Sequence, residues 1–210
     1  GPGTLALPFA ERAAHVTAIE PSPGMIEVMK DQIAELQVHN LTIVPKRWED
    51  VDPSSDLTGR FDIIVASYSL GMPDISAAID KMLAVSSGQI WLFWFAGTTP
   101  WERHMERLWP DIHNESYSHG PKSDVLYNVL YQKGIYPNMT VHEMKYEKKY
   151  QSMDDAVYEM RRQIGCSDNY DPLIKEYLKD KIYMNGQSFI ENGMTTRVCM
   201  WWDSNQYPKK

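Results

Sequence analysis

The segment VTAIEPSPGM at residues 16–25 decides the fold class. It opens on a short run of apolar and β-branched residues, which is the pattern of a strand buried in a parallel sheet. Glu20 ends that run. Ser22 can cap a helix and Pro23 suits its first position, and apolar side chains then recur at helical spacing as far as Leu36. The segment therefore predicts a strand, an acidic residue at its carboxyl end, and a capped helix.

Similar units occupy the first half of the chain. Apolar patterns of helix or strand type occur at residues 4–13 (helix), 41–44 (strand), 61–66 (strand), 75–83 (helix) and 89–95 (strand). Strands that alternate with helices imply right-handed crossovers between parallel neighbours. We therefore predict an α/β fold with a doubly wound, mostly parallel sheet and helices on both faces.

The second half changes pattern. Helices are predicted at residues 101–109, 123–132, 153–164 and 172–183, and strands at residues 139–150 and 188–202. Residues 191–193 interrupt the last strand as a hairpin turn or a bulge. These two strands predict an antiparallel addition at the C-terminal edge of the sheet. Of the neighbours Trp201 and Trp202, one ring should lie in the core and the other should be exposed.

Size and charge limit the classes of function. The chain has 210 residues, 43% of them apolar, which fits a single domain over residues 1–210 with a sizeable core. It carries 21 basic and 28 acidic residues, a net charge of −7, which argues against a nucleic-acid partner. No apolar run is long enough to span a bilayer, so no membrane partner is expected. The oligomeric state stays open.

The cysteine content indicates the compartment. Cys166 and Cys199 cannot form a disulfide framework, and neither belongs to a metal-binding pattern. We therefore expect free, buried thiols, no metal site and a cytoplasmic location.

Ligands of open α/β sheets bind beyond the carboxyl ends of the strands. Glu20 occupies that position after the first predicted strand, and a carboxylate there can accept hydrogen bonds from both hydroxyls of a ribose. Gly1 and Gly3 precede it and would let the backbone pass close to a nucleotide-like ligand. This arrangement predicts a nucleotide-type cofactor, and NAD(P) bound by a Rossmann oxidoreductase is one alternative.

Four segments resemble the successive motifs of class I S-adenosylmethionine-dependent methyltransferases of the small-molecule, UbiE-like type. They are GPGT at residues 1–4, VTAIEPSPGM at residues 16–25, RWED at residues 47–50 and FDIIVAS at residues 61–67. The resemblance implies a methyltransferase that uses S-adenosylmethionine, with a cofactor-binding half at residues 1–97. Residues 98–210 would supply acceptor-site helices and closing strands for a small-molecule acceptor. A binding module that keeps the fold without activity is a further alternative.

The resemblance assigns roles to individual residues. Gly1 and Gly3 end the glycine-rich loop, Glu20 holds the ribose hydroxyls, and Pro21 and Met25 lie near the adenine or the ribose. Ser67, Tyr68 and Ser69 flank the methyl and amino-acid end. The residues expected to bind the cofactor are Gly1, Gly3, Glu20, Pro21, Ser22, Met25, Arg47, Trp48, Glu49, Ser67 and Tyr68. No catalytic residue is assigned.

The segment RWED at residues 47–50, which the resemblance places at the adenine and which we call the adenine segment, departs from the family pattern. Arg47 stands where an aspartate is common, and Trp48 stands where an alanine is common. Either Glu49 or Asp50 contacts the adenine, or the Trp48 ring stacks on the purine. Alternatively, Trp48 belongs to a hydrophobic cover and does not contact the cofactor.

Further candidates lie in the second half. His104, His113 and His119 are either ordinary surface residues or bases at the acceptor site. Arg161 and Arg162, on a helix expected over the pocket, either recognise an acidic acceptor group or belong to a solvated face. The many aromatic residues of this half predict a flat or apolar acceptor.

The glycines at the start of the sequence lead to a prediction about the sheet. In the family that the motifs resemble, the glycine loop follows a strand at the middle of the sheet. If Gly1 and Gly3 are a native motif rather than a processing scar, that strand lies outside the sequence. The sheet should then be divided at its centre, and a single intact sheet of seven strands would contradict this interpretation.

Overall fold

The computed structural model describes residues 1–207. Its first half contains α1 (Ala6–Ala10), β1 (Val16–Ile19), α2 (Pro23–Glu35), β2 (Leu41–Val44), the short 3-10 helix η1 (Trp48–Asp50), β3 (Phe61–Ser67), α3 (Ile75–Val85) and β4 (Ser86–Ala96). The second half contains α4 (Pro100–His113), α5 (Ser123–Gln132), β5 (Asn138–Tyr150), α6 (Met153–Ile164), η2 (Asp168–Tyr170), α7 (Asp171–Leu178), β6 (Ile182–Asn185), β7 (Ser188–Asp203) and η3 (Ser204–Gln206).

The strands form two sheets. β1 and β2 make a parallel pair, and the larger sheet has the order β3-β4-β7-β5, with β6 also paired to β7. β3 and β4 run parallel, whereas β7 is antiparallel to β4, β5 and β6. The predicted α/β class and the late antiparallel strands are therefore confirmed. Within residues 1–207 no strand ladder joins β1 to β3, so the seven strands are divided between two sheets, as the sequence motifs led us to expect.

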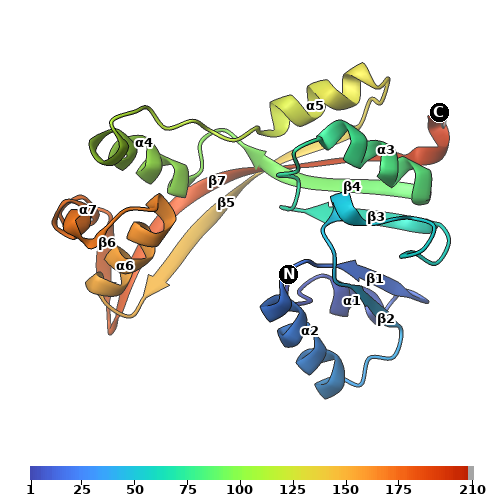
Figure 1. The fold of residues 1–210 in the computed structure, drawn as a ribbon, viewed down its shortest axis with the longest axis horizontal. Helices are drawn as coiled ribbons and strands as arrows, with labels where there is room; N and C mark the ends of the chain where they lie inside the picture. Colours follow the sequence, from blue (N-terminus) through green and yellow to red (C-terminus); the bar gives the residue numbers. More distant parts are fainter. Residues whose placement is uncertain (208–210) are drawn as a thin grey trace.

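Two large hydrophobic clusters lie at different places along the molecule. The first packs the large sheet against α3 and α5, with Ile79, Leu130 and Trp202 almost fully buried. The second joins α4, α6 and α7 to β6 and the outer ends of β5 and β7, a region that we call the helical lobe. Figure 1 shows β5 and β7 as long strands that run from the first cluster into this lobe. A single domain with two halves stays a prediction.

A smaller cluster connects the two sheets. Val44 from β2 and Val85 from α3 bury their side chains together with Val51 and Leu57. Each fully buried side chain of this size contributes about 1.5–3 kcal/mol. The β1–β2 pair is therefore held against the large sheet by packing rather than by backbone hydrogen bonds.

Of Trp201 and Trp202, one ring lies in the core as strand alternation predicts, but the other is half-buried rather than exposed. Trp202 is only 1% exposed in the first cluster, whereas Trp201 is half-buried and stacks on Trp91 of β4, with ring centroids 5.0 Å apart and planes inclined by 5°. The cysteines are both free, Cys199 being buried and Cys166 half-buried.

Several predicted elements differ in extent from the structure. α4 covers Pro100–His113 instead of residues 101–109, and β4 covers Ser86–Ala96 instead of residues 89–95. The first helix covers only Ala6–Ala10 instead of residues 4–13. The helix expected at residues 172–183 ends at Leu178, because the following residues pair with β7 as strand β6. The last strand is not interrupted at residues 191–193, since every residue there has a partner on β5, and the turn lies instead at Gly186, whose φ is +63°.

Candidate cofactor and acceptor site

Gly3 forms a turn that only glycine suits. Its φ is +100°, a backbone conformation that residues with a side chain rarely adopt. A Cβ at this position would lie 3.0 Å from Leu7 Cδ1 and 3.1 Å from Met29 Cγ. The backbone at Gly3 therefore packs closely against α1 and α2. Gly1 is exposed and has open space where a Cβ would be, so packing does not require glycine there.

Glu20 is fixed beyond the carboxyl end of β1. Its side chain is buried, Oε1 accepts a hydrogen bond from the Ser22 backbone N–H at 2.7 Å, and Oε2 contacts the backbone nitrogen of Gly1. An ionised carboxylate offers about four acceptor positions, so further positions stay open for the hydroxyls of a ligand. The structure thus brings together Gly1, Gly3 and Glu20.

The start of α2 lies next to Glu20. Ser22 occupies the residue before the helix and Pro23 its first turn, as predicted, but the expected hydroxyl cap is wrong: the Ser22 side chain makes no capping hydrogen bond. The Ser22 N–H instead serves to orient Glu20. Pro21 and Met25 are both exposed beside it, Met25 with 45% of its surface accessible.

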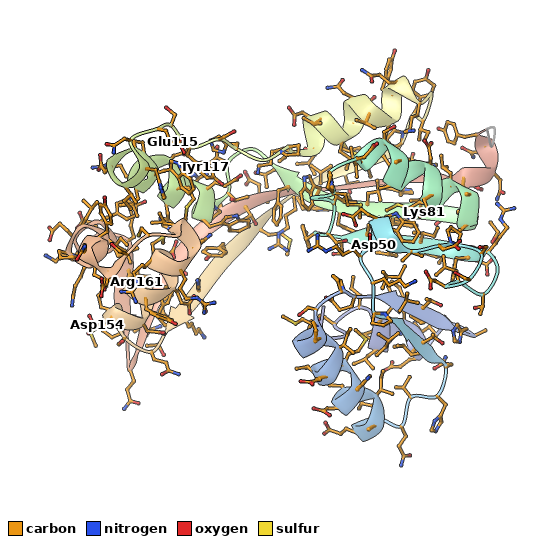
Figure 2. The ribbon with its side chains drawn as sticks, in the orientation of Figure 1. Asp50, Lys81, Glu115, Tyr117, Asp154 and Arg161 are labelled. Atoms are coloured by element: carbon orange, nitrogen blue, oxygen red, sulfur yellow. The ribbon has the colours of Figure 1, made fainter. Side chains whose placement is uncertain are left out.

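The adenine segment is clamped onto α3. The Trp48 indole N–H donates to the Ala78 carbonyl at 3.1 Å, and its half-buried ring packs against both clusters of the sheet region. Lys81 donates to the carbonyls of Trp48, Glu49 and Val51 at 2.8–2.9 Å, and Figure 2 shows Lys81 beside Asp50. This geometry favours the hydrophobic-cover role of Trp48.

The side chains on either side of Trp48 are free to meet a ligand. Arg47, Glu49 and Asp50 are all exposed. Their predicted contacts with adenine stay predictions.

Tyr68 has an unusual backbone at the end of β3. Its φ is +53°, which costs free energy for a bulky residue and persists only where its surroundings enforce it. The Tyr68 N–H donates to the Phe93 carbonyl at 3.0 Å, and its ring, 36% exposed, lies 4.7 Å from that of Phe95. Ser67, half-buried, and Ser69, exposed, flank it.

A row of rings continues from Tyr68 toward the helical lobe. Phe95 and Trp101 have ring centroids 5.1 Å apart, and Trp101 and Tyr146 have centroids 5.8 Å apart. We call these four residues, Tyr68, Phe95, Trp101 and Tyr146, the aromatic row. Arg197 lies beside its first member, with its guanidinium 5.0 Å from the Tyr68 ring centroid.

Sequence reasoning missed most of this row. Only Tyr68 was predicted. The other three rings come together through the register of β4 against β7, and no local sequence pattern reveals that register. One local signal does exist for Trp101. Thr99 and Glu102 form a capping box, with Thr99 N–H and Oγ1 bonded to Glu102 Oε2 at 3.0 and 2.8 Å, and this fixes the start of α4.

His104 is buried rather than on the surface. Its Nε2 lies 2.6 Å from Glu191 Oε1 and its Nδ1 lies 2.9 Å from the Tyr177 hydroxyl. The Tyr150 hydroxyl donates to Glu191 Oε2 at 2.9 Å. Both ring nitrogens of His104 are therefore engaged inside the helical lobe, which does not suit a base that must reach an acceptor.

Electrostatics inside this cluster follow from burial and hydrogen bonding. Burial alone would raise the pKa of Glu191, but hydrogen bonds from His104 and Tyr150 and the charge of His104 outweigh it, and the pKa lies below its ordinary value. Burial, followed by the charge of Glu191, raises the pKa of Tyr146 to about 12 and also raises the pKa of Tyr150. Both tyrosines are therefore neutral at physiological pH, and Tyr150 acts as a hydrogen-bond donor to Glu191.

The other predicted residues of the second half have structural partners. His113 Nε2 is 3.2 Å from the Ile164 carbonyl, His119 Nε2 is 2.9 Å from Glu106, and Arg161 pairs with Asp171 at 2.7 Å. Arg162 is exposed on α6. Figure 2 shows Arg161 in the helical lobe, far from Asp50, so α6 does not lie over a pocket at the adenine segment and the expectation is wrong there.

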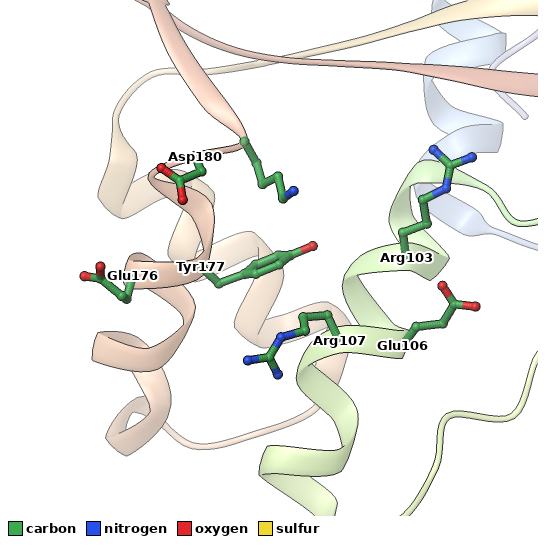
Figure 3. A pocket seen from close by; sticks show the side chains of 7 residues that line it. Arg103, Glu106, Arg107, Glu176, Tyr177 and Asp180 are labelled. Atoms are coloured by element: carbon green, nitrogen blue, oxygen red, sulfur yellow. The ribbon is translucent and has the colours of Figure 1, made fainter.

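Two surface hollows lie on the helical lobe. One, of about 520 Å³, lies between α4 and α7, and Figure 3 shows the Tyr177 ring projecting into it with Arg107 and Glu106 opposite. The other, of about 510 Å³, is lined by residues of β5 and α6. Basic and acidic side chains alternate in both linings, so neither hollow selects one sign of charge.

Residues 1–207 contain no candidate metal-binding cluster and no candidate membrane-spanning helix. No group of three or more His, Cys, Asp or Glu side chains could hold a metal ion. No helix in this part of the chain has the length and apolar character needed to cross a membrane.

Comparisons with known proteins show what this chain is similar to. Residues 1–87 match the family model described as a methyltransferase domain. A Haemophilus influenzae protein with no assigned activity is 26% identical over 206 residues, which cover 97% of this chain and 73% of that protein. A candidate methyltransferase structure from Bacillus halodurans has a TM-score of 0.58 at 14% identity and covers 97% of this chain and 89% of that one.

The magnesium protoporphyrin IX methyltransferase of Synechocystis, solved with bound S-adenosylhomocysteine, gives a TM-score of 0.51 at 13% identity over 94% of this chain and 69% of that one. The matched segment contains Gly3, Glu20 and Tyr68, and the resemblance to methyltransferases that the sequence motifs carry is confirmed. Residues 1–87 therefore match a methyltransferase domain, and the chain shares its fold with solved methyltransferases.

Proposed function

We propose that the protein transfers a methyl group from S-adenosylmethionine to a small-molecule acceptor at the edge formed by the ends of β1 and β3. The observation that carries the proposal is the buried, oriented carboxylate of Glu20 beside the Gly3 turn. A hydroxyl pair of a ribose fits the open acceptor positions of that carboxylate.

When bound, S-adenosylmethionine supplies the methyl group: the acceptor's lone pair bonds to the methyl carbon, the electrons of the broken C–S bond return to sulfur, and a protonated acceptor loses its proton. The chain's own residues bind and orient. Glu20 accepts the ribose hydroxyls, Pro21 and Met25 border the ligand, and Ser67 and Tyr68 flank the reacting end. We assign no catalytic base.

A small acceptor suits the charge of the protein. The net charge of −7 disfavours the polyphosphate backbone of a nucleic acid. The cytoplasmic location predicted from the cysteines stays part of the proposal.

Calorimetric titration of the chain with S-adenosylhomocysteine and with NAD tests the proposal. We expect S-adenosylhomocysteine to bind and NAD not to bind. Glu20→Gln removes a charged acceptor, so affinity for S-adenosylhomocysteine should fall about tenfold or more. Glu27→Gln, on the exposed surface of α2, is the matched control and should bind as the unchanged chain does.

Two results would contradict the proposal. Tight NAD binding without S-adenosylhomocysteine binding would favour the oxidoreductase alternative. Binding of S-adenosylhomocysteine without methyl transfer to any member of a broad acceptor panel would favour a binding module that lacks activity.

A further inference from the structure

We infer that the aromatic row and Arg197 form the acceptor subsite, and that the acceptor is a planar ring system carrying an anionic group. The inference deepens the proposed function and rests on it.

The row lies on one face of the large sheet. Phe95 of β4 stands directly opposite Arg197 of β7, and Tyr146 of β5 stands opposite Gly193 of β7. Directly opposed residues project from the same face, and residues 193 and 197 of β7 share a face because they are an even number of positions apart. Phe95, Arg197 and Tyr146 therefore project from one surface, and Trp101 contacts the rings of both aromatics.

The surface begins at the proposed methyl donor. Tyr68 directly follows β3, at the carboxyl edge of the parallel strands where the donor is expected, and its ring contacts Phe95. Its left-handed backbone is held by the hydrogen bond to the Phe93 carbonyl. A conformation of this cost is typical of functional sites. An acceptor ring placed on the row beside Tyr68 would thus lie next to the donor's reacting end.

The rings are suited to planar ligands. All four are partly accessible, and flat π-systems stack on or pack edge-to-face against such rings with about 0.5–1.5 kcal/mol beyond the area that they bury. Gly193 stands opposite Tyr146 and adds no side chain to this surface. A Cβ at position 193 would lie too close to Pro100.

Arg197 supplies the charge. It donates to two neutral oxygens, Thr195 Oγ1 at 3.2 Å and the Tyr68 hydroxyl at 3.4 Å, and it has no carboxylate partner among residues 1–207. The guanidinium keeps further N–H donors in a planar fork that matches a carboxylate. Its cross-strand neighbour His142 is exposed and contributes no negative charge. A half-buried, uncompensated cation beside aromatic rings fits an anionic substituent on a planar acceptor.

Three probes test the subsite by titration in the presence of S-adenosylhomocysteine. They are 1-hydroxy-2-naphthoate, which is planar and anionic, 2-naphthol, which is planar and neutral, and glutamate, which is charged and not planar. We expect 1-hydroxy-2-naphthoate to bind most tightly. Arg197→Gln should lower the affinity for 1-hydroxy-2-naphthoate about tenfold or more and change the affinity for 2-naphthol by less than about twofold. Arg197→Lys should lower the affinity for 1-hydroxy-2-naphthoate by a smaller factor.

Control variants separate a subsite from a general effect. Arg162→Gln removes an exposed arginine of α6 and should change neither affinity. Trp101→Ala should weaken both naphthalene probes, and Tyr158→Ala, an exposed ring on α6, should weaken neither. Circular dichroism of each variant verifies folding, and Arg197→Lys serves if Arg197→Gln fails to fold.

The outcomes distinguish the inference from the proposed function. If S-adenosylhomocysteine binds but 1-hydroxy-2-naphthoate does not, or if Arg197→Gln leaves its affinity unchanged, the subsite is wrong while the methyl donor site stands. If glutamate binds more tightly than both naphthalene probes, the acceptor class is also wrong. If S-adenosylhomocysteine fails to bind, the proposed function fails, whatever the probes do.

Discussion

Gly193 sets the distance between the sheet and the first turn of α4. A Cβ built on it would lie 2.9 Å from Pro100 Cγ and 3.2 Å from Pro100 Cβ. Pro100 cannot move aside easily, because its ring is closed and the capping box of Thr99 and Glu102 fixes the turn. The glycine that suggested a turn in the sequence therefore permits a close approach between two elements.

Gly193→Ala should lower the free energy of unfolding by about 1–3 kcal/mol, because the added methyl group overfills a packed contact. Urea denaturation measures the change. Gly120→Ala, where a Cβ would meet nothing within 4 Å, should stay within about 0.5 kcal/mol of the unchanged chain. Equal effects of the two substitutions would refute the packing argument.

Glu191 makes the stability of the helical lobe depend on pH. Its pKa is lowered in the folded chain, so its stabilisation is complete above the ordinary carboxyl value and is lost as pH falls through the folded pKa. Exposed pairs such as Lys175 with Asp154 add at most about 1 kcal/mol, whereas breaking a buried pair costs about 3–5 kcal/mol.

Glu191→Gln should therefore destabilise the protein strongly at pH 7 and less at an acidic pH below the folded pKa of Glu191, where the carboxyl of the unchanged chain is protonated as well. Urea unfolding at both pH values measures the difference. Glu143→Gln, an exposed residue of β5, should show no such pH dependence. A loss that is the same at both pH values would mean that Glu191 contributes through packing alone.

Elements set by local pattern were predictable, and those set by pairing were not. The predicted bounds of α5 and α6 agree with the structure because their apolar spacing and their ends lie within the segment itself. β6 was missed because Ile182 and its neighbours become a strand only through their partners on β7. For the same reason the sequence indicated Glu20 and Tyr68, which end predicted strands, but not Arg197, whose place depends on register.

The molecule as a whole has two packed regions that share two strands. The sheet region contains the proposed donor site, and the helical lobe has its own cluster around Ile174 and Leu178, both fully buried. Because β5 and β7 cross from one region to the other, the regions are joined by continuous backbone rather than by a flexible linker.

Ile174→Ala should cost about 2–5 kcal/mol of stability, because it leaves a cavity in the helical lobe. Its affinity for S-adenosylhomocysteine should nevertheless stay within about twofold, since Glu20 and Gly3 lie in the other region. Denaturant unfolding and calorimetric titration measure the two quantities. A large loss of affinity would show that the sheet region and the helical lobe are coupled.

The stacked pair of Trp91 and Trp201 gives the sheet an optical signature. Two indoles whose centroids lie 5.0 Å apart are close enough for their electronic transitions to couple, and a twist between the two transition dipoles then gives a paired positive and negative band in circular dichroism. That couplet requires β4 and β7 to be in register, because the two tryptophans stand directly opposite each other. Its intensity therefore follows the integrity of the strand pair that carries Phe95 and Arg197, independently of the helical signal from the lobe.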